Sequence, residues 1–137
     1  MVCNAEIDQT AARLSAAAQG GDMPNPVAWF EVSGPDASAL QSFYGEAFDW
    51  QIDANNPMNY GMVEMSEGGI PGGVGPSPDG TAHAIFYVAV ADVQGALDKI
   101  GKLGGSTVMP PMDVPDGPTI ALFADPAGNL IGLMKSM

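Results

Sequence analysis

Cysteine is almost absent from this chain, which has a single one, Cys3, among 137 residues. One cysteine excludes an internal disulfide, and a chain otherwise free of cysteine is typical of a reducing compartment. No apolar run approaches the roughly 18 residues of a membrane span, and the N-terminus lacks a basic region followed by an apolar stretch. The sequence therefore predicts a cytoplasmic protein with no membrane partner.

Basic residues are also scarce. Four Lys and Arg stand against 16 Asp and Glu, which gives a formal net charge of −12. Such a chain repels phosphate backbones and offers no basic patch, so we expect no nucleic-acid partner. The negative charge itself has two interpretations that the sequence leaves open: it keeps the protein in solution, or it attracts a cationic ligand.

Histidine is limited to one residue, His83. A serine nucleophile activated by histidine would depend on His83, and the chain has no GlyXaaSerXaaGly turn to present such a serine. A non-haem iron site of the common kind needs two histidines and a carboxylate, which one protomer cannot supply. With a single histidine, the chain has neither the residues for a two-histidine metal site nor the turn that presents an activated serine.

What the chain does contain is an internal repeat at an offset of 56 residues, from Val27 to His83. Residues 27–40 read VAWFEVSGPDASAL and residues 83–96 read HAIFYVAVADVQGA. Each run changes from the alternation of a strand to the spacing of a helix at an aspartate, Asp36 or Asp92, which is a favoured helix N-cap. The repeat predicts two copies of one folding unit.

Each copy continues in the same order of elements. The helices after the two caps have apolar stripes, Leu40, Phe43, Tyr44, Ala47 and Phe48 in the first and Val93, Ala96, Leu97, Ile100 and Leu103 in the second. Three short strands follow each helix, at 50–52, 60–65 and 70–74 and at 106–108, 119–124 and 130–134. We therefore predict an α+β fold of two βαβββ modules, about 26–76 and 82–137. Helices that cover one side of a curved sheet leave its other side free to line a cavity.

Two segments lie outside this pattern. Residues 1–22 form an N-terminal extension before the domain at 23–137, and its segment 6–19 has the spacing of a weakly amphipathic helix. The extension either packs on the domain or reaches a partner. The second segment contains Pro110, Pro111 and Pro115, and it is interpreted as a rigid connector over one end of the cavity, or as a lid if it moves.

Strand parity identifies the side chains that face the cavity. Trp29 and Glu31 share one face of the first strand, and Tyr87 lies on the matching face of the second module. Tyr60, Met62 and Glu64 on a middle strand, Ala89, and Met134 near the end complete the predicted lining. The predicted ligand-binding residues are Trp29, Glu31, Tyr60, Met62, Tyr87 and Met134. The competing interpretation is that these aromatic and methionine side chains are ordinary core.

Four segments also carry a family resemblance: PNPVAWFEVSGPDASALQSFYGEAFDW, GGIPGGV, FYVAVADVQGALDKIGKLGG and VPDGPTIALFADPAGNLIGLM. Together they resemble the vicinal oxygen chelate superfamily, the group of glyoxalase I, bleomycin-resistance proteins and extradiol dioxygenases. The resemblance covers residues 24–137. It implies paired modules whose eight strands curve around a U-shaped groove, commonly assembled as a homodimer.

The resemblance also implies four positions where metal-dependent members hold a divalent ion. In this chain they fall on Trp29, about Gly73, Ile85 and Gly132, and none of these side chains can bind a metal. We therefore expect no metal and no other cofactor. A displaced site that uses His83 and Glu31 remains the alternative, and the same two residues are the candidates for catalysis, whose residues are otherwise unknown.

Three functions remain open on this reading. The first is a metal-free protein that binds a small organic ligand in the groove, as bleomycin-resistance proteins do. The second is a lyase, isomerase or dioxygenase of the glyoxalase type with displaced metal ligands. The third is a non-catalytic interaction subunit. The fold is compatible with all three functions, so the choice among them depends on the residues of the site.

Overall fold

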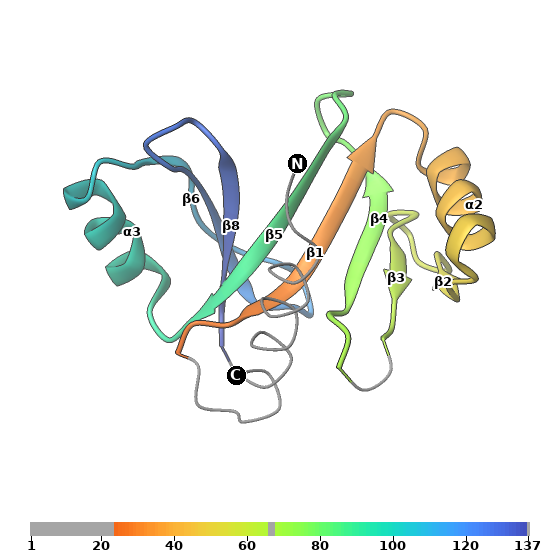
Figure 1. Cartoon of the computed structure of the whole chain (residues 1–137), viewed down its shortest axis with the longest axis horizontal. Coiled ribbons are helices and arrows are strands. Elements are labelled where there is room, and N and C mark those ends of the chain that lie inside the picture. The colour runs from red at the N-terminus through yellow and green to blue at the C-terminus, as the bar shows by residue number, and fades with distance from the viewer. Residues whose placement is uncertain (1–23, 66–67, 137) are drawn as a thin grey trace, which may run out of the picture.

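The computed structural model describes residues 24–65 and 68–136, and within them one mixed sheet of eight strands flanked by two helices (Figure 1). The strands are β1 (Val27–Gly34), β2 (Ile52–Asp53), β3 (Gly61–Val63), β4 (Gly72–Pro76), β5 (His83–Val90), β6 (Ser106–Asp113), β7 (Thr119–Ala124) and β8 (Leu130–Lys135). The helices are α2 (Ala37–Phe48) and α3 (Val93–Lys102). The predicted N-terminal helix and Cys3 lie outside the described residues.

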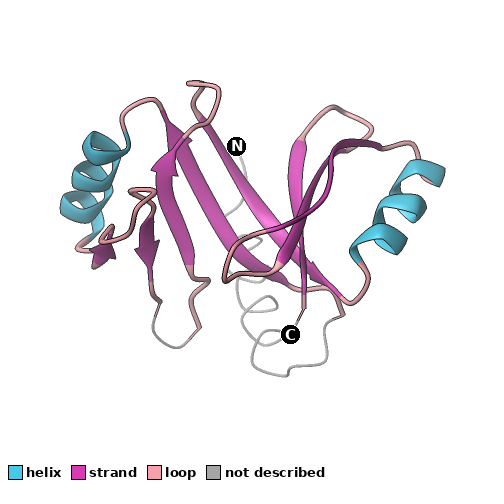
Figure 2. Cartoon of the chain, turned by 180° about the vertical axis from the view of Figure 1, so that it is seen from behind, coloured by secondary structure: helices cyan, strands magenta, loops and turns pink. Residues whose placement is uncertain are grey.

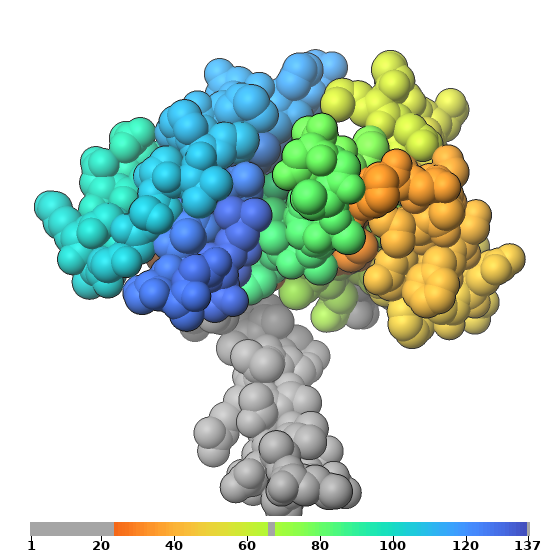
Figure 3. All heavy atoms as spheres, turned by 90° about the horizontal axis from the view of Figure 1, so that it is seen from above, coloured from red at the N-terminus to blue at the C-terminus, as the bar shows by residue number. Residues whose placement is uncertain are grey.

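The order of strands in the sheet, β2-β3-β4-β1-β5-β8-β7-β6, confirms the two-module fold. In each module the first strand pairs in parallel with the last, β1 with β4 and β5 with β8. The modules meet where β1 and β5 pair antiparallel, at the centre of the sheet. The sheet is open, with β2 and β6 at its edges, and the helices lie at opposite ends of the molecule (Figure 2). Seen from above, the two modules lie side by side (Figure 3).

Both helices begin at the predicted aspartates. Asp92 accepts a hydrogen bond from the backbone N–H of Gly95 at 3.0 Å, and Asp36 accepts one from Ala39 at 3.1 Å. Each carboxylate thereby satisfies one of the free amides in the first helical turn. Neither helix of the described part is long and apolar enough to cross a membrane.

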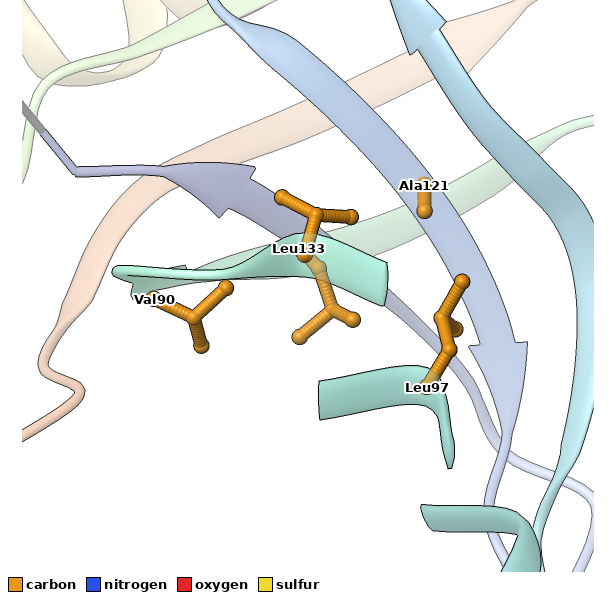
Figure 4. Packing of buried hydrophobic residues seen from close by; sticks show 5 residues of the cluster. Val90, Leu97, Ala121 and Leu133 are labelled. Carbon is orange, nitrogen blue, oxygen red and sulfur yellow. The ribbon is translucent and has the colours of Figure 1, made fainter. Parts of the chain in front are cut away.

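Helix α3 packs against the second module through Val93 and Leu97, which are buried. Their partners on the sheet are Val90, Ala121 and Leu133, and Figure 4 shows the side chains of this cluster between the helix and the strands, with Val90, Leu97, Ala121 and Leu133 labelled. Ala121 and Leu133 are direct cross-strand partners, so they project from the same face of the sheet. The helix-bearing face of the sheet is therefore the one that carries this core.

The predicted buried stripe of α2 is wrong in part. Phe43 and Phe48 are exposed, at 61% and 58% of their surface, whereas Tyr44 is partly buried. Tyr44 stacks on Trp50 with ring centroids 5.9 Å apart, and Phe48 lies 5.3 Å from the same indole. The aromatic rings of this helix thus pack largely on one another. Ala47 and, after α3, Leu103 were also predicted to be buried and are exposed.

The interpretation of Pro110 and Pro111 as a connector is also wrong, since both lie within β6. Proline lacks the N–H that a central strand would need, but β6 is an edge strand paired only with β7. Register shifts between Thr107 and Met109 and between Met109 and Met112 accommodate the prolines.

Candidate functional site

The register brings three of the predicted lining residues to one face of the sheet. Trp29 lies opposite Tyr87, and Glu31 lies opposite Ile85 on one side and Gly73 on the other. Tyr87 in turn lies opposite Gly132. Side chains alternate along a strand, so these residues project away from the face that carries the α3 core. We call this surface the inner face.

Four side chains on the inner face form one hydrogen-bonded group, the Glu31 cluster, which consists of Trp29, Glu31, Tyr60 and Tyr87. The indole N–H of Trp29 donates to the Tyr60 hydroxyl at 3.0 Å. That hydroxyl donates to Oε2 of Glu31 at 3.1 Å, and the Tyr87 hydroxyl donates to Oε1 at 3.4 Å. Both carboxylate oxygens thus accept from a tyrosine. The cluster joins β1, β5 and the residue before β3.

Glycines make room for the two tyrosine rings. A Cβ atom at Gly73 would overlap the Tyr60 ring, and one at Gly75 would lie 2.7 Å from Cδ1 of the same ring. In the second module a Cβ at Gly132 would overlap the ring of Tyr87. Any side chain at these positions would displace a tyrosine. The glycines are therefore a steric requirement of the cluster.

The same geometry decides how well the inner face fits a metal. Gly73 and Gly132 are two of the positions implied for metal ligands, and tyrosine rings occupy the space that ligand side chains would need there. Trp29 and Ile85, at the other two positions, offer no metal-binding atom. Across residues 24–65 and 68–136, no three His, Cys, Asp or Glu side chains gather closely enough to hold an ion. The residues do not fit the metal centre.

Tyr60 is held by a residue that sequence reasoning missed, Asn56. Its side-chain amide donates to the Tyr60 carbonyl at 2.7 Å and its Oδ1 accepts from the Tyr60 N–H at 3.0 Å. Gln41 of α2 adds bonds of 2.9 Å to the carbonyls of Asn59 and Val74. The available signal was the pair of asparagines before Pro57, since Asn side chains often hydrogen-bond nearby backbone in turns.

Burial and the nearby negative charge of Glu31 both raise the pKa of Tyr60 and of Tyr87 well above the usual value near 10. Burial is the larger cause for each, because it penalises the phenolate form. Both phenols are therefore protonated at neutral pH and act as hydrogen-bond donors to the carboxylate.

We expect the protein to lose stability as the pH rises above about 10, where an unperturbed tyrosine ionises. In the unfolded chain Tyr60 and Tyr87 release their protons near that pH, whereas in the folded chain they keep them. The unfolded state then binds fewer protons, so rising pH favours it. Urea midpoints at pH 8 and pH 11 measure the loss. The double variant Tyr60→Phe/Tyr87→Phe should show a smaller pH dependence, and an equal one would contradict the assignment.

Tyr60→Phe should destabilise the fold more than Tyr87→Phe. The Tyr60 hydroxyl makes two bonds, and its loss leaves the Trp29 N–H without an acceptor and Oε2 of Glu31 without a donor. We expect a cost of about 1–3 kcal/mol for Tyr60→Phe and less than about 1 kcal/mol for Tyr87→Phe, whose single bond is longer. Urea denaturation of the two variants measures the difference. If the two variants lose equal amounts of stability, the hydrogen bond from Trp29 to Tyr60 does not contribute to the stability of the fold.

The remaining predicted residues border the cluster. Met62 lies opposite Gly73 and is 40% exposed, and Met134 lies opposite Ala89 and Ile120. Glu64 is exposed just beyond β3. The two methionines extend the inner face with apolar, adaptable surface.

His83 is the first residue of β5 and lies opposite Ser33, a pair that is two residues along the strands from the pair of Glu31 and Ile85. It also borders a pocket of about 660 Å³ that runs along β5, β7 and β8. The pocket is lined by His83, Ala84, Ile85, Phe86, Val88, Phe123, Asp125, Asn129, Leu130 and Ile131. Most of its large apolar side chains belong to the helix-bearing face. Asp125 and Asn129 are bonded to each other in the turn before β8, so the pocket has few free polar groups. The Glu31 cluster is the stronger candidate site.

Comparison with known proteins supports the fold and the family. Residues 27–133 match the family described as the Glyoxalase/Bleomycin resistance protein/Dioxygenase superfamily. The chain is 30% identical over 116 residues to the putative glyoxylase CFP32 of Mycobacterium bovis, covering 79% of this chain and 44% of that protein. It is 30% identical over 130 residues to the anthracycline biosynthesis protein DnrV of Streptomyces peucetius, covering 82% and 47%. The chain thus spans less than half the length of these curated relatives.

Solved structures share the fold at low identity. A methylmalonyl-CoA epimerase in complex with methylmalonyl-CoA and NH4+ aligns with a TM-score of 0.57 at 15% identity, covering 83% of this chain and 96% of that one. A superfamily member from Vibrio splendidus 12B01 aligns with a TM-score of 0.57 at 14% identity, covering 82% and 99%. The family match extends from the start of β1 into β8 and so includes both modules. This chain belongs to the glyoxalase/bleomycin resistance protein/dioxygenase superfamily.

Proposed function

We propose that the chain binds a small organic molecule on the inner face, through the Glu31 cluster and without a metal ion. One observation carries the proposal: the rings of Tyr60 and Tyr87 cover Gly73 and Gly132, and their hydroxyls converge on one carboxylate. Aromatic surface with a few fixed polar atoms is the usual composition of a ligand site. The names of the relatives, a glyoxylase and an anthracycline biosynthesis protein, agree with organic small-molecule ligands.

The metal-dependent alternative has less support in the geometry. It would need His83 and Glu31 to act as displaced ligands, yet among residues 24–65 and 68–136 no third His, Cys, Asp or Glu gathers with such a pair to hold an ion. A lyase, isomerase or dioxygenase of the glyoxalase type would also need further ligands, and His83 is the sole histidine of the chain. The interaction-subunit alternative predicts that no small molecule binds the inner face.

Metal analysis and a ligand screen on the same preparation test the proposal. Protein purified without chelator should contain far less than one equivalent of Zn, Ni, Fe or Mn. A thermal-shift screen of aromatic, dicarbonyl and cationic compounds, with an anthracycline and methylmalonyl-CoA included, should yield a ligand that raises Tm with the logarithm of its excess. Stoichiometric metal together with glutathione-dependent methylglyoxal conversion would favour the enzyme alternative. A screen without any hit would favour the interaction subunit.

Variants on the two faces of the sheet locate the binding surface. Trp29→Ala and Tyr87→Ala should abolish the ligand-induced rise in Tm, because the first removes a partly exposed ring and the second removes the buried ring whose hydroxyl holds Glu31. Phe86→Ala is the matched control, since Phe86 is 40% exposed and belongs to the opposite face of β5. A response lost in the control and kept in the other two would place the ligand in the pocket on the helix-bearing face.

We also propose that the protein is cytoplasmic and forms a homodimer. Support for a dimer comes from the aromatic side chains that α2 leaves exposed, Phe43 and Phe48, because large exposed apolar patches often mark interfaces. Sedimentation of the full chain should show a dimer, and the double variant Phe43→Ala/Phe48→Ala should shift it toward monomer. A dimer that persists in the variant would place the interface elsewhere, and a monomeric parent would contradict the proposal.

A further inference from the structure

We propose that the ligand of the inner face carries a protonated amine, which pairs with the carboxylate of Glu31 among the rings of Trp29, Tyr60 and Tyr87. This inference rests on the proposed function and adds the chemical class of the ligand. It follows from three properties of the Glu31 cluster: its hydrogen-bonding inventory, its charge and its aromatic surface.

The hydrogen-bonding inventory leaves acceptors free and no donors. The N–H of Trp29 donates to the Tyr60 hydroxyl, and the hydroxyls of Tyr60 and Tyr87 both donate to Glu31. A carboxylate has about four lone-pair directions, and the two tyrosines fill two of them. A ligand that meets this cluster must therefore donate hydrogen bonds. An ammonium group donates up to about three and accepts none, so it matches the cluster.

The charge of the cluster points to the same group. Glu31 is partly buried, and its partners are neutral hydroxyls. Of the basic residues in the described part, Lys99 and Lys102 lie on α3, which packs on the other face of the sheet. Lys135 lies opposite Val90, which also belongs to that face. Arg13, the remaining basic residue, lies outside the described residues. The inner face of the described part thus has a carboxylate without a lysine to pair with it.

Aromatic rings around the carboxylate favour an alkylammonium group. The negative faces of indole and phenol rings attract cations, with indole the most effective. The hydroxyls of Tyr60 and Tyr87 donate to Glu31, and the indole of Trp29 donates to the Tyr60 hydroxyl, so the three rings surround the carboxylate. A carboxylate or phosphate ligand would meet the charge of Glu31 and acceptor atoms only. The net charge of −12 acts in the same direction at longer range.

Three naphthalene compounds of similar size separate charge from ring contact. Isothermal titration calorimetry would compare 1-naphthylmethylamine, 1-naphthalenemethanol and 1-naphthoic acid at pH 7 with the full chain. We expect the amine to bind at least about tenfold more tightly than the alcohol, and the acid more weakly than either, since a charged hydrogen bond exceeds a neutral one. The affinity for the amine should fall as NaCl is raised, because salt screens the pairing.

Glu31→Gln should reduce the preference for the amine over the alcohol to less than about threefold, because the carboxamide has no charge to pair with an ammonium group. Glu46→Gln is the matched control, because it removes one negative charge from an exposed position on helix α2, outside the cluster. Circular dichroism confirms that each variant is folded, and the salt dependence of the unmodified protein provides a test that needs no variant.

The outcomes distinguish this inference from the proposed function. Equal binding of amine and alcohol, tighter binding of the acid, or an unchanged preference in Glu31→Gln would each overturn the inference and leave a neutral or anionic ligand for the same face. If none of the three compounds binds but the wider screen yields a ligand lost in Trp29→Ala, the inference is wrong and the proposed function stands. If the screen also yields nothing, both fail.

Discussion

Leu97→Ala should lower the free energy of unfolding by about 2–5 kcal/mol. Leu97 is 4% exposed and packs with Val90, Ala121 and Leu133, which are 8%, 0% and 2% exposed (Figure 4). Helix α3 has only two buried residues, Val93 and Leu97, so Leu97 provides much of its attachment to the sheet. Truncation removes buried methyl groups and leaves a cavity that the strands cannot fill without moving. The midpoint and slope of a urea transition measure the loss.

Leu103→Ala is the matched control, with the same chemical change at a residue that is 69% exposed just after α3. It should change stability by less than about 0.5 kcal/mol. Equal costs at the two positions would contradict the packing of α3. Because the α3 core and the Glu31 cluster lie on opposite faces of the sheet, Leu97→Ala should leave ligand affinity nearly unchanged at temperatures where the variant is folded.

The sequence was sufficient to predict the fold because its signals are local and occur twice. Asp36 and Asp92 mark the change from strand to helix by a short-range bond from each carboxylate to a backbone amide three residues on. The alternation that leads to each aspartate defines β1 and β5. Two such units predict two modules, and the resemblance supplies their pairing.

Errors arose where distant contacts decide the structure. The spacing of α2 predicted one buried stripe, yet Phe43 and Phe48 are exposed. The rings of Tyr44 and Phe48 pack on Trp50, which follows the helix, and this contact is not part of the helical pattern. Predicted strands at 50–52 and 60–65 became β2 and β3, which are two and three residues long. The length of a strand depends on its partner, and β2 pairs with β3 over only two residues. No local pattern contains that information.

In the candidate site, too, the sequence predicted the features that depend on local pattern and missed those that depend on contacts between distant residues. Parity placed Trp29, Glu31 and Tyr87 on one face because the side chains of a strand alternate. Parity does not specify rotamers, so the convergence of two hydroxyls on Glu31 could not be predicted. The sequence analysis singled out Gly73 and Gly132 because they stand at positions where metal-dependent relatives have a metal-binding side chain. The structure shows that the lack of a side chain is what admits the tyrosine rings.

Gly73→Ala should disrupt the Glu31 cluster and remove ligand binding. The added Cβ would overlap the Tyr60 ring, which lies against the β4 backbone and must move. Movement of the ring breaks the bonds that its hydroxyl makes with Trp29 and Glu31. We expect a loss of about 1–3 kcal/mol of stability from the overlap and the lost bonds together. Urea denaturation measures that loss, and the same variant should show no ligand-induced rise in Tm.

Gly101→Ala is the matched control, because a Cβ at Gly101 meets no atom within 4 Å. Gly101 lies in α3, where alanine is favoured over glycine by up to about 1 kcal/mol, so this variant should be as stable as the parent or more so. Gly73→Ala/Tyr60→Ser completes the test. If the overlap is the cause, the double variant should cost less than the sum of its single substitutions, since without the ring the methyl group has space. Additive costs would mean that Gly73 is needed for the backbone of β4 and not for the tyrosine above it.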